Sequence, residues 1–324
     1  MSLAISVIMS VHNEEPHLRD AVGSILNQTF TDFEFIIIDD GSTDKSWQII
    51  QEYAGTDDRI VPLTQKNIGL TSSLNKGIEI ARGKYIARQD ADDKSAPDRL
   101  KKQIEWFDKH SNGVLCGTQG YMINSDNKLL GKIKSLPIEY NSIRKKLKFQ
   151  NVFLHTSVMM LKEAVEKVSG YDDFFRYAQD YDLWCRLANK GEMANLAELL
   201  VYQRLHDDSI TNSQRGAQAL YSIVAAARYC EEITGMESAD IKGDVKDVVI
   251  WLEQQKTIQD HVLALRFLYS PTLDDQWKRS LGEISLRELR HCVMKAPYFL
   301  ARRIFRGFLG EESFARVKGI KDSM

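Results

Sequence analysis

The sequence FEFIIIDDGSTD at residues 33–44 places two aspartates directly after a run rich in aromatic and β-branched residues. Such a run predicts a buried strand over residues 33–38. Further runs of this kind alternate with helix-length amphipathic stretches: strands are predicted at 5–11, 59–63 and 84–87, and helices at 15–27, 43–53 and 70–81. Alternating strands and helices predict a parallel sheet with both faces covered, and ligands then bind at the carboxyl ends of the strands.

The regular alternation ends after a helix predicted at 97–110. Strands in mixed orientation are expected at 113–123, 128–133 and 152–161, followed by a helix at 181–189. From about residue 216 onward the hydrophobic pattern is helical. We therefore predict two parts, an α/β domain over residues 1–215 and a helical region over residues 216–324.

The composition is that of an ordinary folded protein. Of the 324 residues, 43% are apolar and 27% are charged, which argues against the disordered and disulfide-scaffold classes. The net charge of −2 argues against a nucleic-acid partner. The four cysteines form no CxxC pair, and the sequence shows neither a signal peptide nor an apolar run of the ~20 residues that a spanning helix needs. We expect a cytoplasmic protein, either in solution or peripheral at the inner face of the membrane.

Basic residues gather toward the C-terminus, where nine Lys and Arg stand against four Asp and Glu from Arg287 onward. If residues 296–309 form a helix, apolar side chains occupy one face and Arg302, Arg303 and Arg306 the other. This pattern is typical both of a helix on an anionic membrane surface and of a helix packed on a helical core. The sequence leaves both readings open, and it leaves homodimer formation open as well.

A second acidic cluster, formed by Asp90, Asp92 and Asp93, follows the fourth predicted strand. A single aspartate after a strand is most often a helix cap, but two clusters at one sheet edge favour a ligand site. Carboxylates this close repel one another unless a cation neutralises them, and hard oxygen ligands suit Mg²⁺ or Mn²⁺. The chain has neither a GxGxxG after its first strand nor a GxxxxGK[ST] loop. We therefore predict that a metal ion, rather than a glycine-rich loop, holds a bound diphosphate.

Five motifs extend this pattern along the chain: SVIMSVHNEE at 6–15, DDGSTD at 39–44, NIG at 67–69, DADD at 90–93, and GYD with DYDLW at 170–184. In this order they resemble the large family of inverting nucleotide-sugar glycosyltransferases with the A-type fold, the family 2 glycosyltransferases. The resemblance spans about residues 4–212 and does not cover the last hundred residues. It implies an α/β fold in which a Rossmann-like mixed sheet is flanked by helices, with a C-terminal helical extension.

The resemblance implies a set of nucleotide-binding residues. His12 stands where the family usually has an aromatic residue that stacks on the base. Asp39 matches the carboxylate that accepts a hydrogen bond from the base, which is the uracil N–H in a UDP-sugar. Asp90 matches the ribose contact, and Glu14 and Asn67 belong to the motifs around the nucleotide.

The resemblance also implies metal ligands and a catalytic base. Asp92 matches the acidic residue that coordinates Mn²⁺ or Mg²⁺, and His206 lies in a loop where some relatives place a metal-ligating or diphosphate-binding histidine. Asp180 matches the general base that takes the proton of the acceptor hydroxyl. The family usually has Glu-Asp at this point, whereas this chain has Gln179-Asp180, so one charge near the acceptor is absent. Asp182 is expected in the first turn of a helix, where the helix dipole favours a carboxylate.

For four more polar residues, the sequence allows two interpretations each. Asp93 is either a site residue or a helix cap. His155 is either structural or part of the acceptor side of the site. Arg88 and Arg204 are either phosphate contacts or surface ion pairs.

The predicted activity is the metal-dependent, inverting transfer of a sugar from a nucleoside-diphosphate sugar, with UDP favoured, to a carbohydrate or lipid-linked glycan acceptor, as in surface polysaccharide synthesis. Two other classes compete with this prediction. A nucleotidyltransferase would have a basic glycine-rich loop after its first strand, where this chain has VHNE at 11–14. A non-catalytic nucleotide-sugar-binding protein would have lost Asp180 or Asp92, and both are present.

Overall fold

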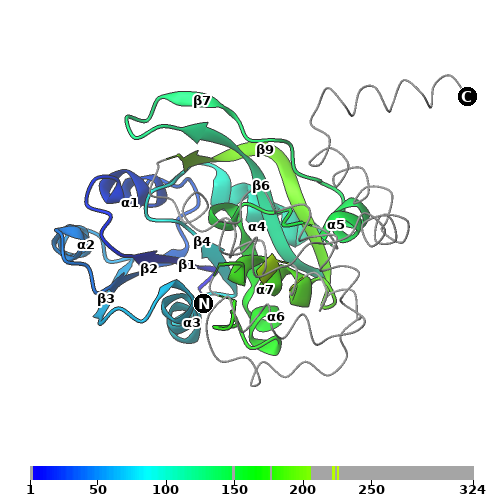
Figure 1. The fold of residues 1–324 in the computed structure, drawn as a ribbon, viewed down its shortest axis with the longest axis horizontal. Coiled ribbons are helices and arrows are strands. Elements are labelled where there is room, and N and C mark those ends of the chain that lie inside the picture. Colours follow the sequence, from blue (N-terminus) through cyan, green and yellow to red (C-terminus); the bar gives the residue numbers. More distant parts are fainter. Residues whose placement is uncertain (1–2, 148–149, 176, 206–220, 223–224, 226–324) are drawn as a thin grey trace, which may run out of the picture. The chain divides into compact units, whose positions relative to one another are not determined.

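The computed structural model describes residues 3–147, 150–175, 177–205, 221–222 and 225 (Figure 1). The predicted helical region over 216–324 falls almost wholly outside these residues. The helix expected at 296–309 and the metal-ligating role of His206 fall outside them too. The elements described below all belong to residues 3–205.

The first part of the sheet is parallel, as the alternating pattern predicts. Its strands lie in the order β3-β2-β1-β4, with bounds β1 Ile5–Val11, β2 Phe33–Asp40, β3 Ile60–Gln65 and β4 Tyr85–Arg88. The connecting helices are α1 Leu18–Leu26, α2 Ser46–Ala54 and α3 Leu70–Ile80. Every residue of β2 is buried, which is the pattern of a parallel strand covered on both faces.

The second part of the sheet mixes orientations, which confirms the prediction for this region. β4 pairs antiparallel with β8, β8 pairs antiparallel with β6, and β6 pairs parallel with β9. The short strand β5 pairs with β9, and β7 forms a hairpin with β6. The bounds are β5 Lys94–Ser95, β6 Gly113–Ile123, β7 Leu129–Lys132, β8 Met159–Leu161 and β9 Glu192–Arg204. Because two antiparallel pairings separate β4 from β6, these two strands run in the same direction and their carboxyl ends lie at one edge.

Four helices belong to this second part: α4 Arg99–Lys109, α5 Tyr140–Leu147, α6 Lys162–Lys167 and α7 Gln179–Leu187. The helices predicted at 97–110 and 181–189 correspond to α4 and α7, whereas α5 and α6 were not predicted. β9 was not predicted either, because its sequence EMANLAELLVYQR lacks the period-two alternation of a half-buried strand.

The strand predicted over residues 152–161 is wrong for most of its length. Only Met159–Leu161 form strand β8, and His155–Ser157 form a 3-10 turn. The hydroxyl of Ser157 donates to the carbonyl oxygen of Leu154 at 2.9 Å. Local side-chain to backbone hydrogen bonds of this kind compete with strand pairing, so the apolar run does not extend into the sheet.

Helices pack directly on the parallel strands. α1 buries four residues with the spacing of one helical face: Leu18, Ala21, Val22 and Ile25. α3 comes close enough to β1 that a Cβ at Gly77 would lie 2.6 Å from Cγ2 of Ile8. Only glycine fits at this position without a shift of the helix or of the isoleucine.

A buried arginine holds the two parts of the sheet together. Arg99, at the start of α4, is 0% exposed, and burial together with the positive charge of Arg88 lowers its pKa to about 9. Its guanidinium donates to neutral oxygens of Ser95 (2.8 Å), Gln103 (3.2 Å), Gln89 (3.1 Å) and the carbonyls of Arg88 (2.7 Å) and Val158 (3.2 Å). One side chain therefore joins the end of β4 to the segment that precedes β8.

We expect Arg99→Met to lower the free energy of unfolding by about 3 kcal/mol, because several buried oxygens lose their donor at once. Thermal or urea unfolding measures this loss. Lys101→Met, on the exposed face of the same helix, is the matched control and should leave the stability within about 0.5 kcal/mol of the wild type. Equal stability of both variants would show that the buried guanidinium contributes nothing net.

Candidate active site

Three of the predicted residues, His12, Asp39 and Asp90, lie at the carboxyl edge of the parallel strands. The register pairs Val11 with Asp39 and Asp39 with Thr64 across β1, β2 and β3. His12 directly follows β1, and Asp90 follows β4, which pairs with the other side of β1. The fold therefore brings the first and second acidic clusters to one edge, as expected.

His12 and Asn67 lie in contact. The imidazole of His12 is exposed, and its Nδ1 lies 3.0 Å from the carbonyl oxygen of Asp40. The amide nitrogen of Asn67 lies 3.2 Å from the same ring nitrogen. Gly41, with φ of +73°, allows this approach, because a Cβ there would lie 2.7 Å from the backbone nitrogen of Asn67. The exposed ring thus lies between the end of β2 and the loop after β3.

The paired aspartates at the end of β2 have different contacts. Asp39 is 2% exposed, and its Oδ2 accepts a hydrogen bond from the hydroxyl of Thr64 at 3.0 Å. Asp40 accepts from the backbone N–H groups of Ile68 and Gly69, each at 2.9 Å. Burial alone would raise the pKa of Asp40, but these hydrogen bonds and that of Gln65 hold it below its ordinary value. Asp40, which was not among the predicted site residues, organises the loop that carries Asn67.

The segment that holds the HNEE motif is bonded to the segment after β2 by hydrogen bonds from backbone N–H groups to side-chain oxygens. Asn13, in the left-handed conformation with φ of 56°, accepts from the N–H of Thr43 at 2.7 Å. The N–H of Glu14 donates to the hydroxyl of Ser46 at 2.9 Å. The loops after β1 and β2 therefore form one unit around the predicted nucleotide site, and the position of Glu14 is fixed through its main chain.

Buried Arg88 and half-buried Asp90 form an ion pair at the end of β4. Arg88 is 2% exposed, and its Nη2 lies 2.5 Å from Oδ1 of Asp90. The N–H of Asp90 donates to the hydroxyl of Thr156 at 3.1 Å, so the residue is also tied to the 3-10 turn before β8. The interpretation of Arg88 as part of a surface ion pair is wrong, since this guanidinium lies in the interior and orients Asp90.

Asp93 is not a helix cap. The residue before α4 is Asp98, and Oδ1 of Asp93 instead accepts from the N–H of Arg204 at 2.7 Å. Burial and the negative charges of Asp92 and Asp90 raise the pKa of Asp93 well above its ordinary value. The pKa change indicates that the three carboxyls of this cluster are close enough to repel one another.

Arg204 connects the acidic cluster to the β6–β7 turn. Its Nε donates to the carbonyl oxygen of Asp92 at 2.8 Å, and its Nη1 donates to the carbonyl oxygen of Asn124 at 2.7 Å. The side chain is fully buried, so the interpretation of Arg204 as part of a surface ion pair is wrong as well. Within the described ranges, no three His, Cys, Asp or Glu side chains gather as a complete cation site.

Asp180 lies in the first turn of α7 and is half-buried. Oδ2 accepts from the amide of Asn151 at 2.6 Å, and Oδ1 accepts from the N–H of Tyr181 at 2.7 Å. Burial raises the pKa of Asp180 to about 6, and the negative charge of Asp90 adds to the rise while the two hydrogen bonds oppose it. The influence of Asp90 indicates that the predicted base lies near one of the predicted nucleotide residues.

Asp182, two residues further along α7, has a structural role. It is 0% exposed and pairs with Arg186, whose Nη2 lies 2.6 Å from Oδ2 of the aspartate. Nη1 of Arg186 donates in turn to the carbonyl oxygen of Gly170 at 2.7 Å. The GYD and DYDLW motifs are therefore joined by this ion pair, which fixes the turn ahead of α7.

His155 and Tyr171 contact each other, and the charges of Arg88 and Asp90 influence both. Nε2 of His155 lies 2.9 Å from the hydroxyl of Tyr171. Burial, together with the positive charge of Arg88, lowers the pKa of His155 to about 3, so the imidazole is neutral at physiological pH. Burial raises the pKa of the Tyr171 hydroxyl. The contact with Tyr171 agrees with the structural interpretation of His155, which the sequence could not separate from an acceptor contact.

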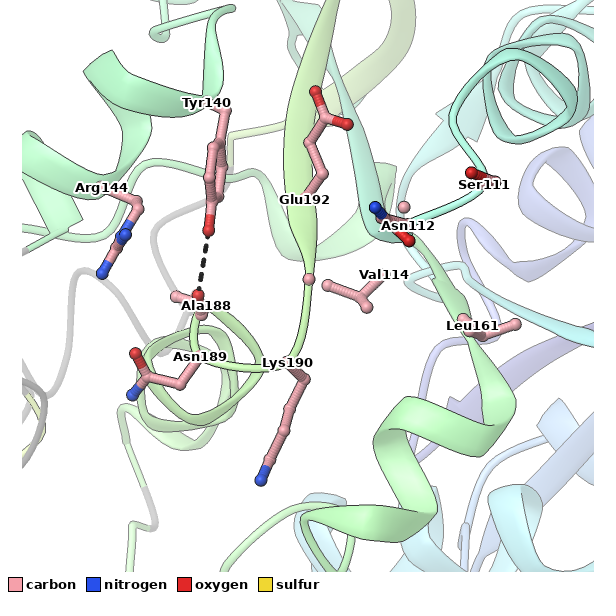
Figure 2. A pocket seen from close by; sticks show the side chains of 12 residues that line it. Ser111, Asn112, Val114, Tyr140, Arg144, Leu161, Ala188, Asn189, Lys190 and Glu192 are labelled. Carbon is pink, nitrogen blue, oxygen red and sulfur yellow. Dashed lines mark hydrogen bonds between the residues drawn. The ribbon is translucent and has the colours of Figure 1, made fainter.

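A cavity of about 780 Å³ lies at the opposite edge of the sheet (Figure 2). Its lining includes Tyr140 and Arg144 of α5, together with Lys190 and Glu192 near the start of β9. Leu161, which also lines it, pairs with Tyr85 at the start of β4, whereas Asp90 follows the end of that strand. Of the predicted nucleotide, metal and base residues that the structure describes, none lines this cavity.

Residues 6–169 match the family model described as glycosyl transferase family 2. The chain belongs to glycosyl transferase family 2. An uncharacterized glycosyltransferase of Methanocaldococcus jannaschii is 36% identical over 222 residues, which cover 67% of this chain and 76% of the relative. The O-antigen biosynthesis glycosyltransferase WbnJ of Escherichia coli is 35% identical over 223 residues, which cover 67% of this chain and 84% of the relative. This family 2 chain is thus a glycosyltransferase, as the motifs predicted.

Solved structures confirm the A-type glycosyltransferase fold. TarS from S. aureus in complex with UDP-GlcNAc aligns with a TM-score of 0.60 at 15% identity and covers 94% of this chain and 81% of its own. The mannosyltransferase PcManGT from Pyrobaculum calidifontis in complex with GDP-Man and Mn²⁺ aligns with a TM-score of 0.56 at 14% identity. It covers 95% of this glycosyltransferase and 86% of its own chain.

Proposed function

We propose that this glycosyltransferase carries out metal-dependent, inverting transfer of a sugar from a nucleoside-diphosphate sugar, with Asp180 as the general base. The observation that carries the proposal is the Asp180 carboxyl itself. It is half-buried, its pKa is raised to about 6, and it lies within the electrostatic influence of Asp90. A carboxylate with a pKa this close to neutral is matched to proton removal at physiological pH.

In this mechanism the oxygen of the acceptor hydroxyl attacks the anomeric carbon of the donor. The new glycosidic bond forms as the bond from that carbon to the diphosphate oxygen breaks on the opposite side, which inverts the configuration. Asp180 takes the hydroxyl proton, and its two hydrogen bonds from Asn151 and Tyr181 hold the carboxylate in one orientation. The transition state resembles an oxocarbenium ion, so nearby negative charge also stabilises it.

A divalent cation fits this site when it is bound together with the donor. Mg²⁺ and Mn²⁺ are commonly held by one or two carboxylates and by substrate phosphates rather than by a complete protein cage. Asp92, half-buried beside Asp90 and Asp93, supplies such a carboxylate in the proposal, and His206 is the second proposed ligand. Bound there, the cation stabilises the negative charge of the leaving diphosphate.

UDP is the nucleotide we propose for the donor, with Asp39 and Asp90 contacting the base and ribose, and His12, Glu14 and Asn67 completing the binding site. The structural neighbours bind UDP-GlcNAc in one case and GDP-Man in the other, so the nucleotide has to be tested directly. Thermal shifts with UDP-, GDP- and dTDP-sugars in the presence of Mn²⁺ make that test. The largest shift for a UDP-sugar supports the proposal, and a larger shift for GDP- or dTDP-sugars contradicts it.

We propose a glycan or lipid-linked acceptor, which the O-antigen role named for WbnJ supports.

The catalytic domain is proposed to span residues 1–215, and residues 216–324 are proposed to form a separate helical region. In the part of the chain that the structure describes, every helix is too short or too polar to cross a bilayer. Cytoplasmic location and homodimer formation stay predictions, which cell fractionation and analytical ultracentrifugation test.

The pH dependence of transfer should report on Asp180. We expect kcat/KM to fall as the pH drops below about 6, because the carboxyl must be ionised to accept a proton and its pKa is raised to about 6. Asn151→Ala removes a hydrogen bond that favours the ionised form, so the acid limb of the profile should move to higher pH. An acid limb that stays in place in this variant would contradict the assignment of the limb to Asp180.

A further inference from the structure

Two adjacent leucines are exposed on the β6–β7 hairpin, which extends from the body of the fold (Figure 1). Leu129 is 54% exposed and Leu130 is 51% exposed. They are consecutive residues of strand β7, so their side chains leave opposite faces of the hairpin and both reach solvent. Exposed leucines scattered singly are ordinary, but these two give the exposed edge strand of the hairpin an apolar side chain on each of its faces.

The hairpin presents the leucines on a rigid support. The side-chain oxygen of Asn124 accepts from the N–H groups of Asp126 at 3.0 Å and Lys128 at 2.9 Å, which closes the turn. The amide of Asn127 donates to Asp20 of α1 at 2.8 Å and accepts from Arg204 at 2.9 Å. The turn is therefore fixed to α1 and β9, and the leucines that follow it are held in place before any partner binds.

Features of β7 argue against pairing with another strand. β7 pairs with β6 alone in the described sheet, spans four residues, and has a register shift opposite it between Met122 and Ile123. The exposed lysines Lys128 and Lys132 stand at its two ends. Short, irregular edge strands flanked by lysine are typical of edges that avoid strand addition, so the leucines do not serve a second copy of the chain in this way.

Positive charge surrounds the leucine pair. Lys128, Lys132 and Lys134 are all exposed, and Asp126 is the acidic residue within the same arm of residues 124–135. Apolar side chains among lysines match an anionic bilayer, because the leucines enter the acyl boundary while the ammonium groups remain at the phosphates. A hairpin tip of this size is too small for a stable protein interface, whereas partial insertion into a membrane needs only a few apolar side chains.

We propose that the β6–β7 hairpin docks this enzyme on an anionic membrane surface through Leu129 and Leu130. Arg204 joins the turn of this hairpin to the backbone of Asp92, so docking would hold the acidic edge of the sheet close to the bilayer. For a lipid-linked acceptor this placement brings the reacting hydroxyl to the site. That consequence rests on the proposed function, whereas membrane binding by the hairpin does not.

Co-sedimentation of the full chain with vesicles tests the proposal. At low salt, the wild type should bind vesicles that contain phosphatidylglycerol and bind phosphatidylcholine vesicles more weakly. The double variant Leu129→Asp/Leu130→Asp should lower the partition onto anionic vesicles at least ~10-fold. Ile80→Asp, a lone isoleucine of α3 that is 37% exposed, is the matched control and should bind as the wild type does.

A second, uncharged double variant distinguishes membrane docking from misfolding and from self-association through the hairpin. Leu129→Gln/Leu130→Gln should also lose binding with an unchanged melting temperature, and hydrolysis of the donor in solution should be unaffected in both double variants. Failure of the wild type to bind anionic vesicles would overturn the proposal. Vesicle binding by the hairpin variants within ~3-fold of the wild type would also overturn it. A loss of self-association in these variants without a loss of vesicle binding would do the same.

Discussion

Asp180→Asn is expected to slow sugar transfer at least ~10²-fold while the donor nucleotide binds with near-normal affinity. The amide has nearly the shape of the carboxyl, and its single oxygen can keep one of the two hydrogen bonds from Asn151 and Tyr181, whereas its NH₂ group cannot accept the other. It cannot take the proton of the acceptor hydroxyl, and the transition state loses its base. Single-turnover kinetics with a nucleotide-binding titration measures the two effects separately.

Asp173→Asn is the matched control for this variant. Asp173 is an exposed carboxylate that accepts a hydrogen bond from Ser72 at 3.1 Å, ahead of the same helix. We expect its turnover to stay within ~2-fold of the wild type. Loss of nucleotide binding with unchanged turnover in Asp180→Asn would contradict the base assignment. Asp182 would not replace it as a candidate, because its carboxylate is buried in the ion pair with Arg186.

Asp92→Asn is expected to reduce transfer by ~10²-fold or more without loss of the fold, because a charged metal ligand is replaced by a weaker neutral one. The carbonyl oxygen of Asp92, rather than its carboxylate, accepts the hydrogen bond from Arg204. The substitution therefore leaves this structural contact in place. The measurement is transfer rate against Mn²⁺ concentration, together with the melting temperature.

Asp58 is an exposed residue before β3, so Asp58→Asn controls for the loss of one negative charge. Its transfer rate should depend on Mn²⁺ concentration as that of the wild type does. The apparent affinity for Mn²⁺ in the presence of donor should drop in Asp92→Asn alone. Full activity of Asp92→Asn in excess chelator would contradict the metal assignment, and full activity of the wild type in chelator would contradict metal dependence as a whole.

The parallel half of the fold could be predicted from sequence because β1, β2 and β4 are almost wholly buried and their sequences are apolar runs. The placement of Asp39 and Asp90 at one edge then followed from topology, since the carboxyl ends of parallel strands share an edge. β9 could not be predicted because its residues are buried, half-buried and exposed in an irregular order. Register shifts also interrupt its pairing with β6.

Contacts within the site could be predicted less well. Asn151 donates to Asp180 across 29 positions of sequence, and neither residue type identifies the other as its partner. Arg204 was interpreted as a phosphate contact or a surface ion pair, but most of its hydrogen-bond partners are backbone carbonyls, among them those of Asp92 and Asn124. A hydrogen bond to a backbone carbonyl cannot be predicted from the side chain of the residue that supplies the carbonyl. Family motifs therefore located the acidic residues, and the structure was needed to find the side chains that orient them.

The anomeric configuration of the first product tests the central claim most directly. With an α-linked nucleotide sugar, Mn²⁺ and no added acceptor, water replaces the acceptor hydroxyl, and proton NMR identifies the free sugar before its anomers equilibrate. A single displacement with Asp180 as base predicts that the β-anomer is formed first and that Asp180→Asn abolishes its formation. Release of the α-anomer first, or an undiminished rate in the variant, would contradict the account.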